Sequence, residues 1–133
     1  MKLNLKYIYL FCILIFTVNI GVAQKSKKVT SSKYDYQGPF CNGLAKVKQN
    51  KKWGFIDTTG NVVVSPKYNE VTNFSDGLAK VRKSEKWGMI DVTGKETIAP
   101  TFDWIYDFED GVAKVKLDGK EYFMNKNGQR VIK

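Results

Sequence analysis

Short runs of alternating apolar and polar residues characterise most of the chain. In residues 43–48, Ala45 and Val47 alternate with Lys46 and Lys48. This two-residue period is typical of a β-strand with one buried face. The alternation returns twice, at Ala79 and Val81 and at Ala113 and Val115. No stretch after residue 23 has the 3.6-residue period of a helix, so the pattern predicts an all-β domain.

Each alternating run is followed by two further predicted strands, which lie at 53–57 and 62–65 in the first instance. Asp57-Thr58-Thr59-Gly60 separates them, and residues 91–94 and 125–128 repeat this turn. An Asp or Asn that bonds the turn backbone, followed by a glycine with positive φ, predicts a type I hairpin turn with a bulge. Because proline cannot donate a ladder hydrogen bond, Pro66 and Pro100 are expected to end the third strand.

The chain is internally repeated. Residues 40–73 align with residues 74–107 without a gap, and 14 of the 34 positions are identical, where chance would give about two. A partial third copy covers 108–133, and residues 34–39 resemble the end of a unit. We therefore predict one β-repeat domain over 34–133, with units 40–73, 74–107 and a partial unit 108–133.

The repeated residues carry a family resemblance. They read Phe-x-x-Gly-Leu-Ala-x-Val, then Lys-Trp-Gly-x-Ile-Asp-x-x-Gly, then Pro-x-Tyr/Phe-Asn/Asp. This pattern resembles the WG-repeat proteins, which are tandem β-repeats common in bacteria. The resemblance covers residues 34–133 and implies an all-β repeat module that serves binding, without shared catalytic residues. The third unit departs from the pattern, with Glu121-Tyr122 in place of Trp-Gly, as terminal repeats often do.

The repeat length favours an open architecture. Propeller blades usually need about 40–45 residues, and 4–8 blades close a ring. Units of about 34 residues, with fewer than three complete, predict an open repeat array of antiparallel β-hairpins or a meander. Because an open array leaves unpaired edges, we expect a self-contact or a partner at its N-terminal end, and a homo-oligomer is one form of it.

The first residues have the pattern of an export signal. Lys2 and Lys6 precede an uncharged apolar run over 7–18, and Gly21 and Ala23 form a small-x-small site. This order predicts a signal peptide over 1–23, cleaved after Ala23, followed by a flexible basic linker over 24–33. The alternative is an uncleaved membrane anchor; cleavage would leave no transmembrane span in the mature chain. We expect an exported protein, located in the periplasm, on the outer surface or in the medium.

Composition narrows the chemistry. The 133 residues include 22 Lys and Arg, 13 Asp and Glu and no histidine, which gives a formal charge of +9. The lack of histidine excludes Ser-His-Asp and Cys-His catalysis and imidazole metal ligands. Cys12 and Cys41 are too few for a thiolate zinc site, and we expect neither cofactor nor metal. Cys41 aligns with Ser75 and Glu109, which predicts a tolerant, exposed turn.

Equivalent cations recur in each unit. Stacked units would form three columns, and nine charges would then make a continuous basic face: Lys46, Lys80 and Lys114; Lys48, Arg82 and Lys116; Lys52, Lys86 and Lys120. Such a face would attract an acidic envelope polymer or an anionic lipid surface, whereas export makes nucleic acid an unlikely ligand. The alternative is a solvated sheet face that lysine keeps soluble.

Tryptophans are the second group of candidates. The repeat context predicts core positions for Trp53 and Trp87, with Gly54 and Gly88 leaving space for a neighbouring ring. Trp104 has no tryptophan counterpart in the other units. An exposed Trp104 could anchor a sugar ring or a protein partner, so we include it in the possible binding surface.

These observations favour an exported, non-enzymatic β-repeat module that presents a surface to an unknown protein or an envelope polymer. An alternative is a small glycan hydrolase that uses carboxylates between Asp103 and Asp110, which form an acidic cluster. A structural spacer, or a fragment of a longer array, is the remaining alternative.

Overall fold

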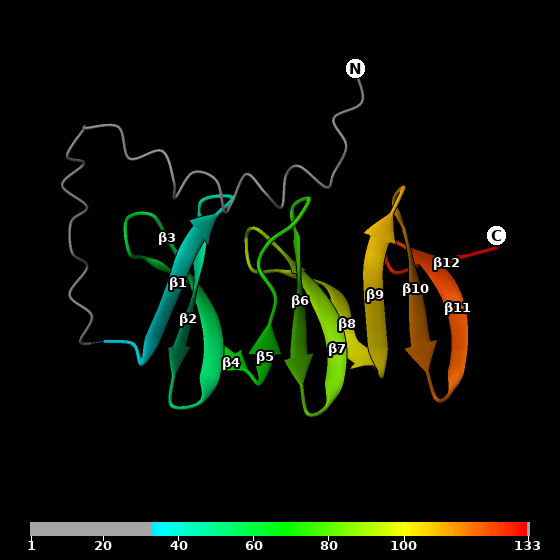
Figure 1. The fold of residues 1–133 in the computed structure, drawn as a ribbon, viewed down its shortest axis with the longest axis horizontal. Coiled ribbons are helices and arrows are strands. Elements are labelled where there is room, and N and C mark those ends of the chain that lie inside the picture. The colour runs from blue at the N-terminus through cyan, green and yellow to red at the C-terminus, as the bar shows by residue number, and fades with distance from the viewer. Residues whose placement is uncertain (1–32, 133) are drawn as a thin grey trace, which may run out of the picture.

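The computed structural model describes residues 33–132, and the regular structure in this part of the chain consists entirely of β-strands. Twelve strands form three four-stranded antiparallel sheets that stand in a row along the long axis of the molecule (Figure 1). The first sheet contains β1 (Tyr36–Cys41), β2 (Leu44–Gln49), β3 (Lys52–Asp57) and β4 (Val62–Tyr68). The second contains β5 (Glu70–Val71), β6 (Leu78–Lys83), β7 (Lys86–Asp91) and β8 (Glu96–Phe102). The third contains β9 (Trp104–Glu109), β10 (Val112–Leu117), β11 (Lys120–Asn125) and β12 (Arg130–Val131).

The expected fold class is confirmed: the domain is an open all-β array, and its three sheets do not close into a barrel. The boundaries of the sheets are shifted along the chain relative to those of the predicted sequence units. A periodic sequence does not itself mark where a unit starts. Residues before Phe40 form most of β1, and residues before Phe108 form most of β9. Three sheets of four strands result, although β5 and β12 have only two residues each. The predicted signal peptide and most of the basic linker fall on residues 1–32, outside the described residues.

The expectation that Pro66 and Pro100 end a strand is wrong, since β4 and β8 continue through them to Tyr68 and Phe102. Trp53 pairs with Tyr68 but Phe55 pairs with Val64, so β4 carries two extra residues opposite β3. This bulge contains the proline, where the missing N–H leaves no ladder bond unmade. The second sheet repeats the bulge, with Trp87 opposite Phe102 and Met89 opposite Ile98.

The bulge explains the glycine of each Trp-Gly pair. A Cβ on Gly54 would lie 2.2 Å from the Val64 carbonyl oxygen and 2.7 Å from the Pro66 nitrogen; Gly88 meets Ile98 and Pro100 in the same way. The glycine therefore makes room for backbone and not, as expected from sequence, for a neighbouring ring. In the third sheet Tyr122 stands at this position, and there β11 and β12 pair without a bulge.

The predicted Asp/Asn–Gly turns are confirmed. Asp57 Oδ1 accepts the Thr59 and Asn61 amides, each at 2.9 Å, and the Gly60 N–H donates to the Asp57 carbonyl at 3.0 Å. Gly60 has a φ of 89°. These side-chain bonds hold the pKa of the Asp57 carboxyl below its usual range, chiefly through Thr59, and Asp91 is lowered in the same way through Thr93. Asn125 makes the equivalent turn with an amide oxygen.

The other hairpins use two-residue turns in which both residues have positive φ. Asp118 and Gly119 form such a turn between β10 and β11. The equivalent turns place Lys51, at φ 65°, and Glu85, at φ 66°, where the third sheet has glycine. A side chain in this left-handed conformation costs about 1–2 kcal/mol.

We predict that Lys51→Gly and Glu85→Gly each stabilise the fold by about 1 kcal/mol, because glycine adopts this conformation without a Cβ clash. The free energy of unfolding from urea titration measures the gain. Gly119→Lys is the matched reverse change and should lose a similar amount. Equal stability of all three variants and the wild-type protein would contradict the strain.

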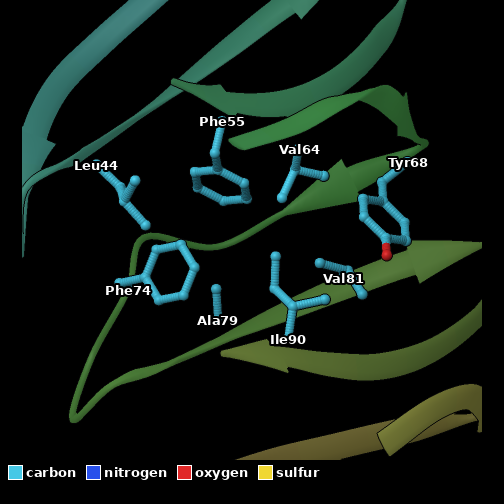
Figure 2. Close-up of a cluster of buried hydrophobic side chains, with 8 residues drawn as sticks. All are labelled: Leu44, Phe55, Val64, Tyr68, Phe74, Ala79, Val81 and Ile90. Atoms are coloured by element: carbon cyan, nitrogen blue, oxygen red, sulfur yellow. The ribbon is translucent and has the colours of Figure 1, made fainter. Parts of the chain in front are cut away.

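The two larger hydrophobic clusters lie between neighbouring sheets. At the first junction Leu44, Phe55, Val64 and Tyr68 of the first sheet meet Phe74, Ala79, Val81 and Ile90 (Figure 2). At the second junction the contributions come from Trp87, Met89, Ile98 and Phe102 on one side and Ile105, Ala113, Val115 and Met124 on the other. The middle sheet is thus apolar on both faces. Ala45 and Val47, expected to be buried, are fully buried with Ile56 in a third cluster, and the half-buried Tyr34 packs against it.

Tyr68 is the largest of the fully buried side chains. Its hydroxyl donates to Glu96 Oε1 at 2.7 Å. Burial and then this hydrogen bond raise the pKa of the Tyr68 hydroxyl above its ordinary value. The phenol therefore stays neutral, as its place between two sheets requires.

Cys41 differs from its expected environment. It is the last residue of β1 and only 5% exposed. The exposed turn follows it, at Asn42 and Gly43, whose φ angles are both positive. Alignment with Ser75 and Glu109 therefore did not indicate how deeply the Cys41 side chain is buried.

Candidate interaction surface

Six of the nine cations of the predicted basic face, Lys46, Lys48 and their equivalents, lie on the sheet face that carries Phe55 or its equivalent. The register places the third column, Lys52, Lys86 and Lys120, on the opposite face. Lys46 pairs with Phe55 and Lys48 with Trp53 in the β2–β3 register, so these lysines share a face with core residues. Ala45 and Val47 occupy the opposite face, as predicted. Lysine stems can cover apolar surface while the ammonium group stays in contact with polar atoms.

Four of these nine cations are bound to carboxylates. Lys80 Nζ lies 2.7 Å from Asp107 Oδ1 and donates to the Ile105 carbonyl at 3.2 Å, so it links the second sheet to the third. Lys86 makes a similar link to Asp103. Within sheets, the guanidinium of Arg82 and the ammonium of Lys114 each lie 2.5 Å from a carboxylate, of Glu70 and Glu121 respectively.

The remaining five cations of the columns are Lys46, Lys48, Lys52, Lys116 and Lys120, for which the described residues show no ion pair. Lys46 and Lys48 lie over the Trp53 ring at 5.4 and 5.3 Å from its centroid. The Tyr36 ring meets the same tryptophan edge-on at 5.6 Å. These contacts are cation–π and aromatic pairs that stabilise the sheet surface.

The alternative hydrolase function depends on the acidic cluster, whose carboxylates Asp103 and Asp107 bind different lysine side chains. Lys86 holds the pKa of Asp103 below its usual range, and the amides of Asp118 and Gly119 add to this effect. Asp107 is bound to Lys80. A glycosidase acid needs a raised pKa, so these contacts bias Asp103 away from that role. No cluster of three or more potential metal-ligating side chains occurs among residues 33–132.

The three tryptophans differ in exposure. Trp87 is 9% exposed and belongs to the core between the second and third sheets, as predicted. Trp53 is half-buried beneath its two lysines. Trp104, at the start of β9, is 44% exposed. The predicted core position is therefore confirmed for Trp87 and is wrong for Trp53, which belongs to none of the three core clusters.

Trp104 belongs to a group of aromatic side chains that sequence reasoning missed. Its ring rests edge-on against Trp87 at 5.3 Å and against Tyr106 at 6.4 Å. Tyr106, two residues further along β9 and on the same face, is 41% exposed. Lys114 lies 5.3 Å above the Tyr106 ring, and Arg82 lies 5.9 Å from the Trp87 ring. We call Trp104, Tyr106, Lys114 and Arg82 the Trp104 patch.

A sequence signal for Tyr106 was available. The repeat offset places Thr72 and Gly38 at its position in the other two sheets, and Glu70 and Tyr36 at the position of Trp104. The second sheet forms with polar residues at both positions, so its architecture does not require aromatic residues there. An aromatic pair confined to one unit is a deviation from the repeat, and such deviations indicate residues that the shared fold does not explain.

An open depression of about 420 Å³ lies on the outer face of the third sheet. It is bordered by Lys114, which belongs to the Trp104 patch, and by Glu121, the ion-pair partner of Lys114. The other lining residues are Tyr122, Phe123, Arg130, Val131 and Ile132. Arg130 lies 5.1 Å from the Tyr122 ring centroid.

These features define an all-β repeat array without a long apolar helix: no helix capable of crossing a membrane occurs in the described residues. The chain belongs to the WG-repeat family, since the model of the WG containing repeat matches residues 24–53, 53–87 and 87–120. Two matched segments begin at Trp53 and Trp87, the tryptophans whose glycine neighbours lie under the bulges. Comparison with the curated proteins and with the solved structures gave no match.

Proposed function

We propose that this protein is an exported, non-enzymatic β-repeat module that uses the Trp104 patch to bind a protein or an envelope polymer. The observation that carries the proposal is the exposed pair Trp104 and Tyr106, 44% and 41% exposed, beside the cations Lys114 and Arg82. Tryptophan, tyrosine and arginine are the side chains that contribute most to binding energy at protein interfaces.

The proposal is supported because the repeat fold does not require aromatic residues at positions 104 and 106. Trp87 already fills the core position, and Trp104 covers it from outside. Two large exposed aromatic rings expose apolar area to water, which costs solubility unless a ligand covers it. The leader pattern at residues 1–23 supports export, where envelope polymers and surface proteins are available as ligands.

The experiment is an affinity capture from the envelope fraction of the source cell, with the full chain immobilised. We expect the double variant Trp104→Ala/Tyr106→Ala to lose the captured ligand, because truncation of such anchors commonly weakens binding by at least 2 kcal/mol, or about 30-fold. The matched control is Tyr36→Ala, which removes an aromatic residue of similar exposure (46%) from the first sheet.

Retention of the same ligand by the double variant would refute the patch as the binding site. A second variant, Lys48→Glu/Lys52→Glu/Lys116→Glu, tests the basic columns, because these cations have no ion pair among the described residues. Loss of ligand in this variant alone would assign binding to the diffuse positive charge. Turnover of a glycan panel that disappears in Asp107→Asn would favour the hydrolase instead.

A further inference from the structure

We propose that the outer face of the third sheet binds the outer face of the first sheet in a second copy of this chain, so that the array continues from molecule to molecule. The inference does not use Trp104 or Tyr106, although Lys114 of the Trp104 patch also lines the depression on this face. Its test changes neither aromatic residue, so its failure and that of the proposed function can be distinguished. It is based on the two junctions inside the chain, whose contacts can be transferred by the repeat offset to the two ends of the row (Figure 1).

The first transferred contact is an aromatic pair. At the first junction Phe55 and Phe74 pack edge-on with ring centroids 4.9 Å apart (Figure 2). The offset places Phe123 at the position of Phe55 and Phe40 at the position of Phe74. Phe123 lines the 420 Å³ depression, and Phe40 is 40% exposed. The two members of a pair already used in the core therefore recur on opposite end faces.

The second contact joins a turn glycine to an aliphatic side chain. Gly94 of the second sheet lies against Val64 of the first, and Gly128 of the third lies against Ile98 of the second. The next pair in this series would be Gly60 of one copy and Ile132 of another. Ile132 is 97% exposed, and a Cβ added to Gly60 would meet nothing within 4 Å.

The third contact is electrostatic. Lys86 of the second sheet binds Asp103, whose N–H donates to the Lys116 carbonyl beside β9. Asp35 occupies the same position beside β1, since its N–H donates to the Lys48 carbonyl, and the offset places Lys120 at the position of Lys86. Both are exposed, and neither has an ion pair among residues 33–132. The two members of this ion pair therefore also recur at opposite ends of the row.

The centre of the first sheet's outer face is already closed within one chain. Tyr34 packs on Ala45, Val47 and Ile56. Tyr68 shares a cluster with Ala79, Val81 and Ile90, the equivalents of those residues one repeat later. Tyr34 thus stays in place, and the second copy adds contacts at Phe40, Gly60 and Asp35 around it.

The two joined faces are different, so the contact is head-to-tail. A head-to-tail contact leaves one free face of each kind on the growing assembly, and it produces open chains unless its rotation closes a ring. This property gives a test that a symmetric dimer would fail.

The test is sedimentation velocity of the full chain over a range of concentrations, with Phe40→Glu and Ile132→Glu as end-face variants. We expect the wild-type protein to form a concentration-dependent series of species, and each variant alone to sediment as a monomer. An equimolar mixture of the two variants should form a dimer of twice the monomer mass and nothing larger, since each retains one intact face. Val92→Glu is the matched control: Val92 is 43% exposed, and polar residues occupy its equivalents, so it should associate like the wild-type protein.

Each other outcome overturns the proposal. A wild-type protein that remains monomeric at all concentrations has no such contact. Self-association of the Phe40→Glu variant alone would indicate a symmetric contact between two third sheets.

Two controls complete the test. Far-ultraviolet circular dichroism checks that both end-face variants fold. The charge reversal Asp35→Lys/Lys120→Asp should restore the association that either single change weakens.

Discussion

Gly88→Ala is expected to destabilise the domain by on the order of 3 kcal/mol, enough to unfold a marginally stable repeat array. The added Cβ would lie 2.4 Å from the Ile98 carbonyl oxygen and 2.6 Å from the Pro100 nitrogen. Both atoms belong to the backbone of the bulge in β8, so the clash cannot be relieved by turning a flexible side chain. Guanidinium titration followed by tryptophan fluorescence gives the change in unfolding free energy.

The control is Gly38→Ala in β1. There the nearest heavy atom to the new Cβ is Lys46 Cγ at 3.1 Å, which belongs to a flexible side chain. Thr72 and Tyr106 stand at the equivalent positions of the other sheets, so a side chain is compatible with this site. We expect Gly38→Ala to change the unfolding free energy by less than about 1 kcal/mol. If Gly88→Ala is equally mild, the bulge does not require glycine.

Phe55→Ala is expected to cost about 3–5 kcal/mol, because it removes a fully buried ring from the first junction and leaves a cavity. The lost contacts include the edge-on packing with Phe74. Phe55→Met copies Met89, the equivalent residue of the second sheet, and should cost less than about 1.5 kcal/mol. Urea unfolding monitored by fluorescence measures both changes.

The Phe55→Ala result also tests how the sheets share stability. In a repeat array each unit contacts only its neighbours, and loss of one junction can uncouple the units on either side. We expect the unfolding of Phe55→Ala to separate into two transitions, the first from the first sheet. A single sharp transition at unchanged midpoint would contradict the role of this junction.

The lysine columns show how repetition can imitate a binding site. Stacked lysines suggested a ligand-binding face, yet Lys80 and Lys86 bind Asp107 and Asp103 across a junction between sheets. The sequence contained both partners of each pair. It did not indicate that these pairs lie across a junction, because the sequence unit 74–107, which contains all four residues, is divided between the second and the third sheet.

Much of the local structure could be predicted. The alternation at Ala45 and Val47 identified β2, and Asp57 with Gly60 identified its turn, because strand periodicity and turn chemistry depend on neighbouring residues. The predictions for Pro66 and Cys41 were wrong, because both depend on how a strand pairs and packs.

Repeat length, the two central strands of each sheet, the Asp/Asn–Gly turns and the open all-β class were determined by the sequence alone, since each follows from residues a few positions apart or from comparison of one unit with the next. The first strand of each sheet was not predicted. Tertiary structure decided which strands form one sheet, why Trp is followed by Gly, and which aromatic rings remain exposed. Trp87 and Trp104 illustrate the difference: the two indoles contact each other at 5.3 Å, but only the packing of the third sheet onto the second buries one and exposes the other. Burial depends on contacts between units, and a periodic sequence does not specify them.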